Sequence, residues 1–311
     1  MTSPISSPSL AESPRKSSDS LWGRLKKQSL FWIGAALLLL LLGAALGAST
    51  LAKGAPDAIY PDGLDSLGVP AAPGGEFRFG ADTLGRDVWT RVLYGARLSL
   101  IVALCAMLTS VFIGTIVGLL GGFFGGWVDS ALTRFTEIVA SLPTILLAIT
   151  LAVILPPRIE PIPWLFGFDG DLTLVRLLLA IGLVTWTRIA RAVRGEVLAL
   201  KEREFIEAAR ALGLSNFTIL RRHLLPNVLP TVTVLATLAT ASNILLEAGL
   251  SYLALGLKPE DPSWGGLIAE GQPYLITAPW ISLAPGIAIV LAVCAFNLLG
   301  NALGDALETR K

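Results

Sequence analysis

The residues with the widest choice of chemistry lie together in one charged segment, Glu207 to Pro226, which reads EAARALGLSNFTILRRHLLP. We call it the docking segment. Gly213 follows an Ala-rich stretch and tolerates the left-handed backbone at a helix end, and Ser215 can cap a second helix. The spacing predicts two short helices joined by a tight turn, which can read bases in a DNA groove or fill a cleft on another protein.

The charges of the docking segment favour a protein partner over nucleic acid. The predicted first helix begins a few residues before the docking segment and carries carboxylates that would repel phosphate groups: Glu202, Glu204 and Glu207. The small residues Ala208, Ala209 and Gly213 permit close approach to another protein surface instead. Apolar stretches tether residues 191–228 at both ends, which prevents a free dimer geometry on DNA. We therefore expect no nucleic-acid partner.

Few other residues could support catalysis. His223 is the only histidine, so no histidine cluster can hold a metal, and Cys105 and Cys294 lie in apolar stretches, where packing between helices is expected. The sequence contains no GxxxxGK[ST], GxSxG or HExxH motif. We expect no catalytic residue, cofactor or metal in this chain.

The composition predicts an all-α membrane protein. Of the 311 residues, 53% are hydrophobic and only 15% are charged, compared with roughly 25% charged in a typical soluble domain. The charges separate apolar stretches of about 20 residues, which is the length that crosses a bilayer. We expect six transmembrane helices, at about 30–52, 98–121, 136–156, 173–190, 229–256 and 280–303.

Local signals set expectations for the connections. A helix is predicted to begin near Asp87 and to run into the second span, and the glycines of 121–134 predict a turn. Pro143 is expected to be tolerated inside the third span. Pro226 is expected to end the second helix of the docking segment before the fifth span begins. Residues 53–75 are predicted to form an exposed loop.

The distribution of Lys and Arg places both termini in the cytosol. With that orientation the inner segments hold sixteen of the 24 basic residues, and eight of these lie in residues 188–228. The docking segment is then cytosolic. On the outer side, Trp264 and Trp280 flank the last loop, where an aromatic belt at the membrane surface is expected.

The docking segment resembles the EAA loop of binding-protein-dependent ABC importer permeases. The family pattern, EAA-x3-G-x9-I-x-L-P, is matched except for His223 in place of the isoleucine. In that family the loop inserts a helix into a cleft on a cytosolic ATPase. The resemblance implies that ATP and Mg²⁺ bind to partner subunits, and that these residues couple the chain to ATP hydrolysis: Glu207, Ala208, Ala209, Gly213, Ser215, Leu225 and Pro226.

Further segments look like the dipeptide, oligopeptide and nickel branch of the family, C-type subunit, with Phe77 and Ala81 in place of the usual His and Thr. The similar segments are 79–100, 121–149, 262–271 and 285–307. The resemblance implies a type I ABC importer permease fold in a bacterial or archaeal inner membrane. The implied partners are a homologous B-type permease, two cytosolic ATPases, an extracytoplasmic solute-binding protein and membrane lipid.

Composition and this resemblance together divide the chain into three regions. They are a cytosolic tail at 1–29, disordered over 1–20 and basic after it; the first span and outer loop at 30–76; and the permease domain at 77–308, with a coupling loop at 191–228. Peptides are the default cargo of the branch, while nickel chelates, glutathione or another small solute remain alternatives. A secondary transporter and a membrane-tethered DNA-binding regulator are less favoured.

One group of polar residues lies within the expected fifth span. Ser242, Asn243 and Glu247 are predicted toward its outer side, and Asn243 and Glu247 share a helix face because they are four residues apart. Ionisable residues at membrane depth often mark a substrate pathway. Two interpretations stay open for Glu247: contact with a passing substrate, or a structural hydrogen bond to a neighbouring helix.

Overall fold

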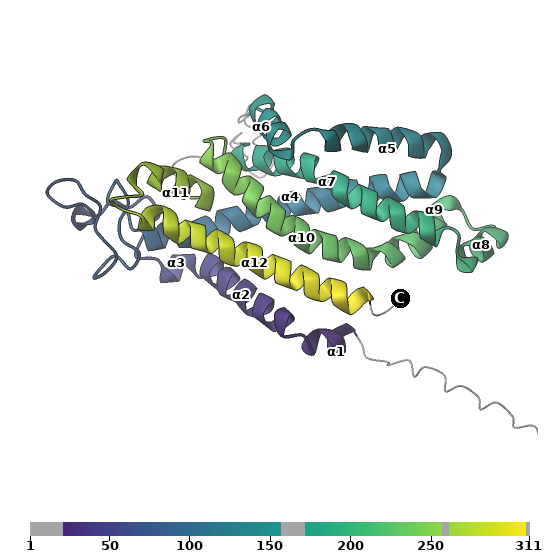
Figure 1. Ribbon diagram of the computed structural model, residues 1–311, viewed down its shortest axis with the longest axis horizontal. Helices are drawn as coiled ribbons and strands as arrows, with labels where there is room; N and C mark the ends of the chain where they lie inside the picture. Colours follow the sequence, from purple (N-terminus) through teal and green to yellow (C-terminus); the bar gives the residue numbers. More distant parts are fainter. Residues whose placement is uncertain (1–20, 157–171, 257–260, 309–311) are drawn as a thin grey trace, which may run out of the picture.

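The computed structural model is a bundle of long helices with irregular segments at one end (Figure 1). It describes residues 21–156, 172–256 and 261–308, so the tail predicted to be disordered at 1–20 lies outside the described residues. Within these ranges there is no β-strand, and the only extended pairings are isolated bridges between residues 59 and 87. The all-α prediction is confirmed for this part of the chain.

Five stretches of helix are long and apolar enough to cross a membrane, by length and composition. They are α2 (Ser29–Leu46), α4 (Val88–Phe124), α7 (Thr173–Leu200), the continuous helix Asn216–Tyr252 and α12 (Trp280–Glu308). A sixth is present among the described residues if the bent pair α5 (Gly126–Ser141) and α6 (Thr144–Ile154) counts as one. The predicted count of six spans is confirmed on that basis.

The third span differs from the prediction of a single helix over 136–156. The chain bends by 94° between α5 and α6. Pro143 causes the bend, because a residue before proline is forced out of the helical region, and Leu142 accordingly has φ −82° and ψ 138°. The predicted turn over 121–134 is also much shorter, since Gly125 alone breaks the chain, with φ 66°, before α5 begins.

The helices α4 and α7 are packed at backbone distance. Gly114, Gly118 and Gly122 recur every fourth residue along α4. A Cβ atom on any of them would lie only 2.7–2.8 Å from atoms of α7, which is closer than real side chains approach. Small residues at this spacing let membrane helices interlock. The two helices therefore form the tightest seam of the bundle.

Several short segments from distant parts of the sequence cover one end of the bundle, which we call the α11 end. It contains α3 (Ala48–Leu51), the short turn η1 (Pro61–Gly63), α11 (Trp264–Gly271) and η3 (Gln272–Tyr274). As predicted, α4 begins directly after Asp87, whose carboxylate accepts a hydrogen bond from the Thr90 amide at 2.9 Å and so caps the helix.

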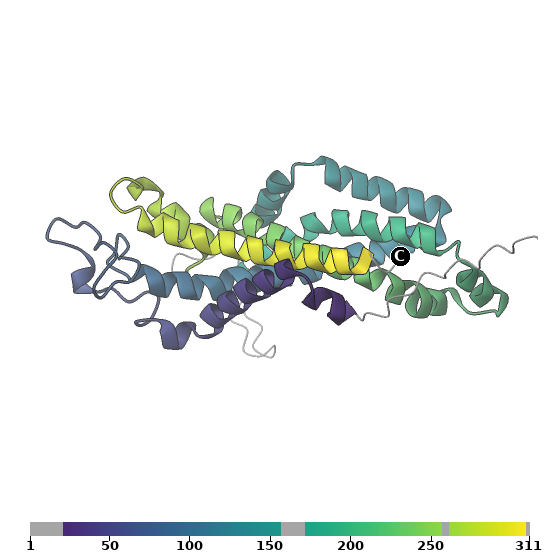
Figure 2. The same ribbon diagram turned by 60° about the horizontal axis from the view of Figure 1, so that its bottom comes forward.

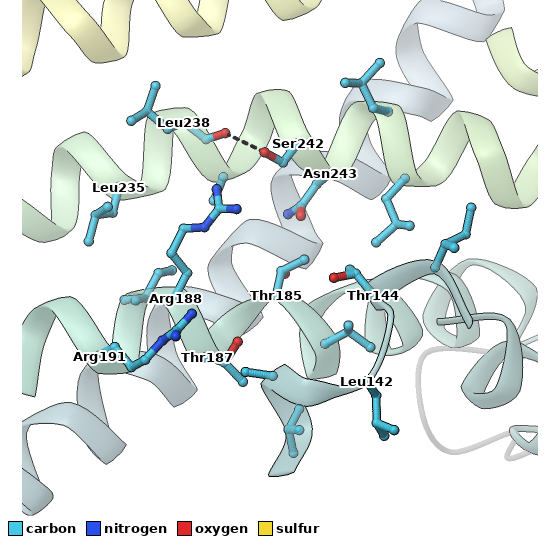
Figure 3. A pocket seen from close by; sticks show the side chains of 18 residues that line it. Leu142, Thr144, Thr185, Thr187, Arg188, Arg191, Leu235, Leu238, Ser242 and Asn243 are labelled. Carbon is cyan, nitrogen blue, oxygen red and sulfur yellow. Dashed lines mark hydrogen bonds between the residues drawn. The ribbon is translucent and has the colours of Figure 1, made fainter. Parts of the chain in front are cut away.

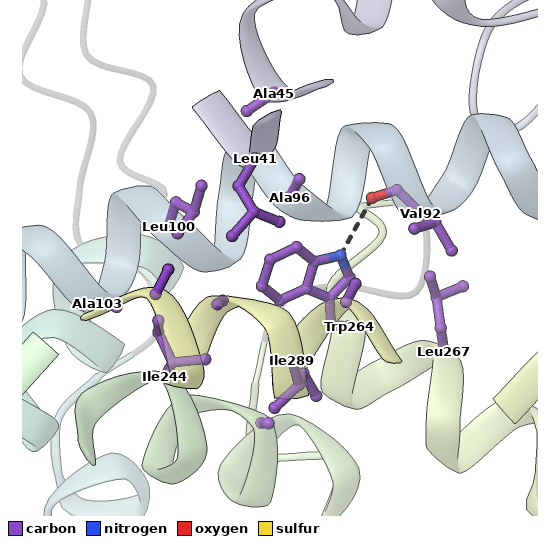
Figure 4. Close-up of a cluster of buried hydrophobic side chains, with 14 of the residues drawn as sticks. Leu41, Ala45, Val92, Ala96, Leu100, Ala103, Ile244, Trp264, Leu267 and Ile289 are labelled. Atoms are coloured by element: carbon purple, nitrogen blue, oxygen red, sulfur yellow. Dashed lines mark hydrogen bonds between the residues drawn. The ribbon is translucent and has the colours of Figure 1, made fainter. Parts of the chain in front are cut away.

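Trp264 anchors α11 to the bundle. Its ring is fully buried among apolar side chains of α2, α4, α10 and α12, and its Nε1 donates to the Val92 carbonyl at 3.1 Å (Figure 4). The predicted place of Trp264 in a surface belt is therefore wrong, because the surrounding small residues, such as Gly95, leave room for the ring inside the protein. Trp280 is half-buried and donates to the Ala81 carbonyl at 2.9 Å.

The opposite end of the bundle, which we call the α8 end, carries α8 (Glu204–Ala211), α9 (Asn216–Thr218) and the π-helical turn η2 (Ile219–Leu224). The short helix α1 (Leu21–Lys26) and the last turn of α12 lie toward this end in both views (Figures 1 and 2). The first and last described residues thus lie on the same side of the bundle, as expected for termini in one compartment.

Candidate functional site

The docking segment forms the predicted helix pair at the α8 end. After α8, Gly213 adopts a left-handed backbone with φ +74°, a conformation that costs little only in glycine. Ser215 caps α9, and its Oγ accepts a hydrogen bond from the Thr218 amide at 3.3 Å. The roles predicted for these two residues in bending the chain are confirmed.

The start of the expected coupling loop differs from the prediction. The first ten residues of the expected coupling loop 191–228 continue α7 to Leu200, because Val193 and Val197 are buried against neighbouring helices. A turn over 201–203 then precedes α8. As a result Glu207 lies in the first half of an eight-residue helix.

Pro226 does not end a helix, contrary to the prediction. It lies in the first turn of α10 (Leu225–Tyr252), which continues from η2 without a break. The wider π-helical turn explains this, because the Leu225 amide donates to the Leu220 carbonyl five residues earlier, which shifts the hydrogen-bond pattern just before the proline. The carbonyl of His223 is satisfied by the Asn227 side chain at 2.6 Å.

Apolar contacts hold α8 against the long helices. Ile206 and Ala209 are buried on its inner face, in a cluster with Ile219, Leu224 and Val228. The outer face exposes Glu207 and Ala208 together with apolar side chains that nothing in the described chain covers. Leu212 is 81% exposed and Phe217 is 69% exposed. The helix pair thus combines a fixed base with an open, partly apolar tip.

His223, which departs from the family pattern, is half-buried and lies beside Phe205 of α8. The two ring centroids are 6.4 Å apart. The aromatic contact connects η2 to α8, a role that an isoleucine could also fill by apolar packing. Of the remaining residues singled out by the pattern, Leu225 is half-buried and Pro226 is exposed.

A cavity of about 530 Å³ opens within the bundle between the α5–α6 bend, α7 and α10. Ser242 and Asn243 line it, together with Thr144, Thr185 and Arg188 (Figure 3). The cavity combines an apolar majority with a few polar groups that converge on it, which is the usual character of a small-molecule site. Glu247 is not among the lining residues.

Glu247 instead faces the interior, where it is fully buried. The Ser251 hydroxyl donates to its Oε1 at 2.7 Å, and the hydroxyls of Ser99 and Ser263 lie beside the carboxyl group. Asn243 shares this helix face, as predicted, and its side-chain amide is fully buried against the backbone of α4 near Ala103 and Met107. These contacts favour the structural interpretation of Glu247 as a link between α10, α4 and α11.

An ion network at the α11 end was missed by the sequence analysis. Asp82 and Arg91 are both buried, and Arg91 Nη1 lies 2.8 Å from Asp82 Oδ2. Arg91 Nη2 also donates to Glu270 of α11 at 3.0 Å. Arg86 contacts both carboxylates, at 2.7 Å from Asp82 and 2.9 Å from Glu270. We call these four residues the outer network, and they fasten the segment before α4 to α11.

The fold and these sites define a class of protein: a helical membrane protein with five or six apolar spans among its described residues, a cavity between α7 and α10, and an exposed helix pair at one end. The family described as "Binding-protein-dependent transport system inner membrane component" matches residues 110–311, and the chain belongs to this family. Its members are transport permeases in the inner membrane and not the catalytic subunits of their importers.

Several known proteins are similar over most of their length. A Brucella suis protein named as a permease of a peptide transport system is 36% identical over 293 residues, which is 92% of this chain and 90% of that protein. The dipeptide transport permease DppC of Alkalihalophilus pseudofirmus is 37% identical, covering 76% of this chain and 73% of its own. The glutathione transport permease GsiD of Escherichia coli strain 536 is 36% identical, covering 93% and 89%.

The solved structures show a similar fold. The MetNI methionine ABC transporter, in an inward-facing conformation, contains a chain that aligns with a TM-score of 0.50 and 22% identity, covering 69% of this chain and 95% of that one. At this identity the likeness concerns the fold alone. It confirms the expected permease fold of a type I ABC importer.

Proposed function

We propose that this permease forms, with a homologous B-type partner, the membrane path of an ATP-driven importer of di- and oligopeptides. Two cytosolic ATPases supply the energy from bound ATP and Mg²⁺, and an external solute-binding protein delivers the cargo. The observation that carries the proposal is the docking segment, a rigid helix pair with an uncovered tip. The names of the similar proteins support peptides, with glutathione as the second candidate.

The docking segment is built to transmit movement. Ile206 and Ala209 fix α8 to α10 through a shared apolar cluster, and Arg210 lies over the Phe123 ring at the end of α4, 5.7 Å from its centroid. A displacement of α8 is therefore passed to two long helices. Leu212 and Phe217 supply apolar contact area for a cleft on the ATPase, and the Glu207 carboxylate can accept a charge-assisted hydrogen bond there.

The mechanism is alternating access. Closure of the ATPase pair on ATP displaces the docking segments of both permeases, and the spans then open the path toward the binding protein. The cavity between α7 and α10 lies on this path in the proposal, with the exposed Ser242 as a polar contact and Asn243 buried behind it. Reopening of the ATPase pair after hydrolysis returns the path to the cytosolic side.

The coupling role can be tested in the complete transporter reconstituted with its ATPases and binding protein. Glu207→Lys reverses the charge at the proposed contact, and Glu202→Lys makes the same exposed change outside α8. We expect Glu207→Lys to insert normally but to lose peptide uptake and its coupling to ATP hydrolysis, while Glu202→Lys retains both. Normal uptake by a correctly inserted Glu207→Lys variant would contradict the proposal.

The cargo can be tested by competition. We expect an excess of unlabelled dipeptide to suppress uptake of a labelled dipeptide, and glutathione or a nickel chelate to compete weakly. Strong transport of glutathione without peptide transport would assign the second candidate instead.

A further inference from the structure

Arg188 lies at the inner end of the fourth span expected at 173–190, where α7 continues without a break to Leu200. An arginine on a membrane helix is costly when it faces lipid, so such residues usually face a water-filled cavity, the membrane surface or a partner. The side chain of Arg188 is exposed and lines the cavity between α7 and α10.

The guanidinium group of Arg188 has no ion pair or hydrogen bond within the described part of the chain. Figure 3 shows it extending from α7 toward α10, on the same side as Ser242. The described lining of the cavity contains no aspartate or glutamate, and Arg191 adds a second positive charge one turn further. The cavity therefore carries net positive charge.

A third arginine on α7, Arg194, shows what a structural arginine looks like here. Arg194 is half-buried and pairs with Asp129 of α5, with Nη2 2.7 Å from Oδ2. This two-point contact fixes α7 to α5. Arg188 lies less than two turns away and has no such partner, although the same helix α5 ends at the edge of the cavity. The difference points to a partner for Arg188 that is not part of this chain.

The other cavity residues suit an anionic group that also needs neutral hydrogen bonds. The Thr187 hydroxyl can donate to a carboxylate oxygen. The Ser242 and Thr185 hydroxyls donate to the Leu238 and Ile181 carbonyls of their own helices and border the same space as acceptors. A guanidinium group binds a carboxylate through two parallel N–H donors, which gives both strength and orientation. A cationic solute would be repelled at this point.

We propose that the cavity binds the carboxylate group of the solute in transit, with Arg188 as its charged contact. The inference rests on the proposed import function and narrows the cargo to solutes that carry a free carboxylate, such as a peptide with its C-terminus unblocked. The competing explanation is a carboxylate of the partner permease that pairs with Arg188 in the assembled path.

A labelling experiment tests the charge of the cavity without any cargo. In the complete transporter with Cys105→Ala and Cys294→Ala, Ser242→Cys is exposed to methanethiosulfonates of equal size and opposite charge. We expect the anionic reagent to react about threefold faster or more, and Arg188→Gln to abolish most of this preference. Equal rates with Arg188 present, or an unreactive Ser242→Cys, would overturn the proposal.

Transport then tests the carboxylate contact. With saturating loaded binding protein, we expect Arg188→Gln to lower dipeptide uptake about tenfold or more while ATP hydrolysis stays responsive to the binding protein. Arg188→Lys should restore part of the uptake, and Arg134→Gln, an exposed arginine outside the cavity, should be neutral. Loss of assembly with the partner permease in Arg188→Gln would assign the arginine to the subunit interface and overturn the proposal.

The two proposals fail in distinguishable ways. If the unaltered transporter imports no peptide, the proposed cargo is wrong, and the labelling rates still decide whether the cavity attracts anions. If it imports peptide and Arg188→Gln does so equally well, the carboxylate contact is wrong and the import function stands.

Discussion

The two ends of the bundle use charged residues in opposite ways. At the α11 end, Asp82 and Arg91 are buried and paired with one another, and Arg91 also pairs with Glu270. At the α8 end, the charged residues of the docking segment are exposed, and its buried contacts are apolar. The charged groups of the outer network at the α11 end pair with one another within the chain, whereas those of the docking segment at the α8 end are exposed and can contact another protein.

This difference indicates which end of the bundle has its contacts satisfied within the single chain. A buried ion network is stable only when every member keeps its partners, so the α11 end behaves as one pre-assembled body. The docking segment needs no partner to keep its shape, because Ile206 and Ala209 anchor it, yet its tip leaves apolar area uncovered. We therefore expect substitutions to damage stability at the α11 end and coupling at the α8 end.

The largest effect is expected for Arg91→Met. Removing Arg91 leaves buried Asp82 with Arg86 as its only cation among the described residues, and breaking a buried pair typically costs about 3–5 kcal/mol of unfolding free energy. Thermal unfolding of the purified protein measures this loss. Arg78→Met is the matched control, because Arg78 lies in the same region but is exposed, and it should change stability little. An Arg91→Met variant as stable as the unaltered protein would remove the contrast between the two ends.

Gly213→Leu is expected to reduce stability less than Arg91→Met but to abolish the coupling of ATP hydrolysis to uptake. The left-handed backbone at φ +74° costs a residue with a side chain about 1–2 kcal/mol, and no atom lies within 4 Å of the added Cβ. The variant should insert and unfold near the normal temperature yet fail to couple ATP hydrolysis to uptake.

Gly195→Leu provides the control for Gly213→Leu. Gly195 also has open space around its Cβ position but lies in α7 with ordinary helical backbone. It should keep both stability and uptake. Equal loss of uptake in the two variants would show that added bulk on this side of the protein, rather than the bend at Gly213, disturbs transport.

The smallest effect is expected for Glu76→Gln, also near the α11 end. The hydrogen bond from Lys53 at 2.7 Å lowers the pKa of the Glu76 carboxyl group, but this group is exposed to water. A carboxyl pKa that is lower in the folded state than in the unfolded state stabilises the folded protein at pH values above the unfolded-state pKa. This stabilisation is lost as the pH falls through the folded-state pKa. At neutral pH, thermal unfolding should show no measurable change, because exposed pairs contribute little. A large change in the unfolding temperature would mean that the position of a charged pair at the α11 end, and not its burial, determines its contribution to stability.

The features that the sequence predicted depend on short-range signals. Asp87 caps α4, Gly213 bends the chain and Ser215 caps α9, and each acts on residues within a few positions. The six spans follow from hydropathy alone. The cavity residues Ser242 and Asn243 were identified because polar residues stand out inside an apolar span.

The features that were missed depend on partners distant in the sequence. Arg91 and Glu270 are 179 positions apart, and nothing in either local segment indicates that they meet. Trp264 is buried by four helices that its own sequence does not specify. The effect of a proline also depends on its surroundings: Pro143 bends its span, whereas Pro226 continues a helix because a π-helical turn precedes it.

The glycine seam between α4 and α7 has a mechanical consequence. Because no side chains separate the two backbones at Gly114, Gly118 and Gly122, they cannot repack into a second arrangement and must tilt as one body. Since α4 is about 55 Å long, a tilt of about 5° would move one tip by about 5 Å relative to the other. A small angular change beneath Arg210 would thus reappear near Arg91, at the opposite end of α4, as a displacement of about 5 Å.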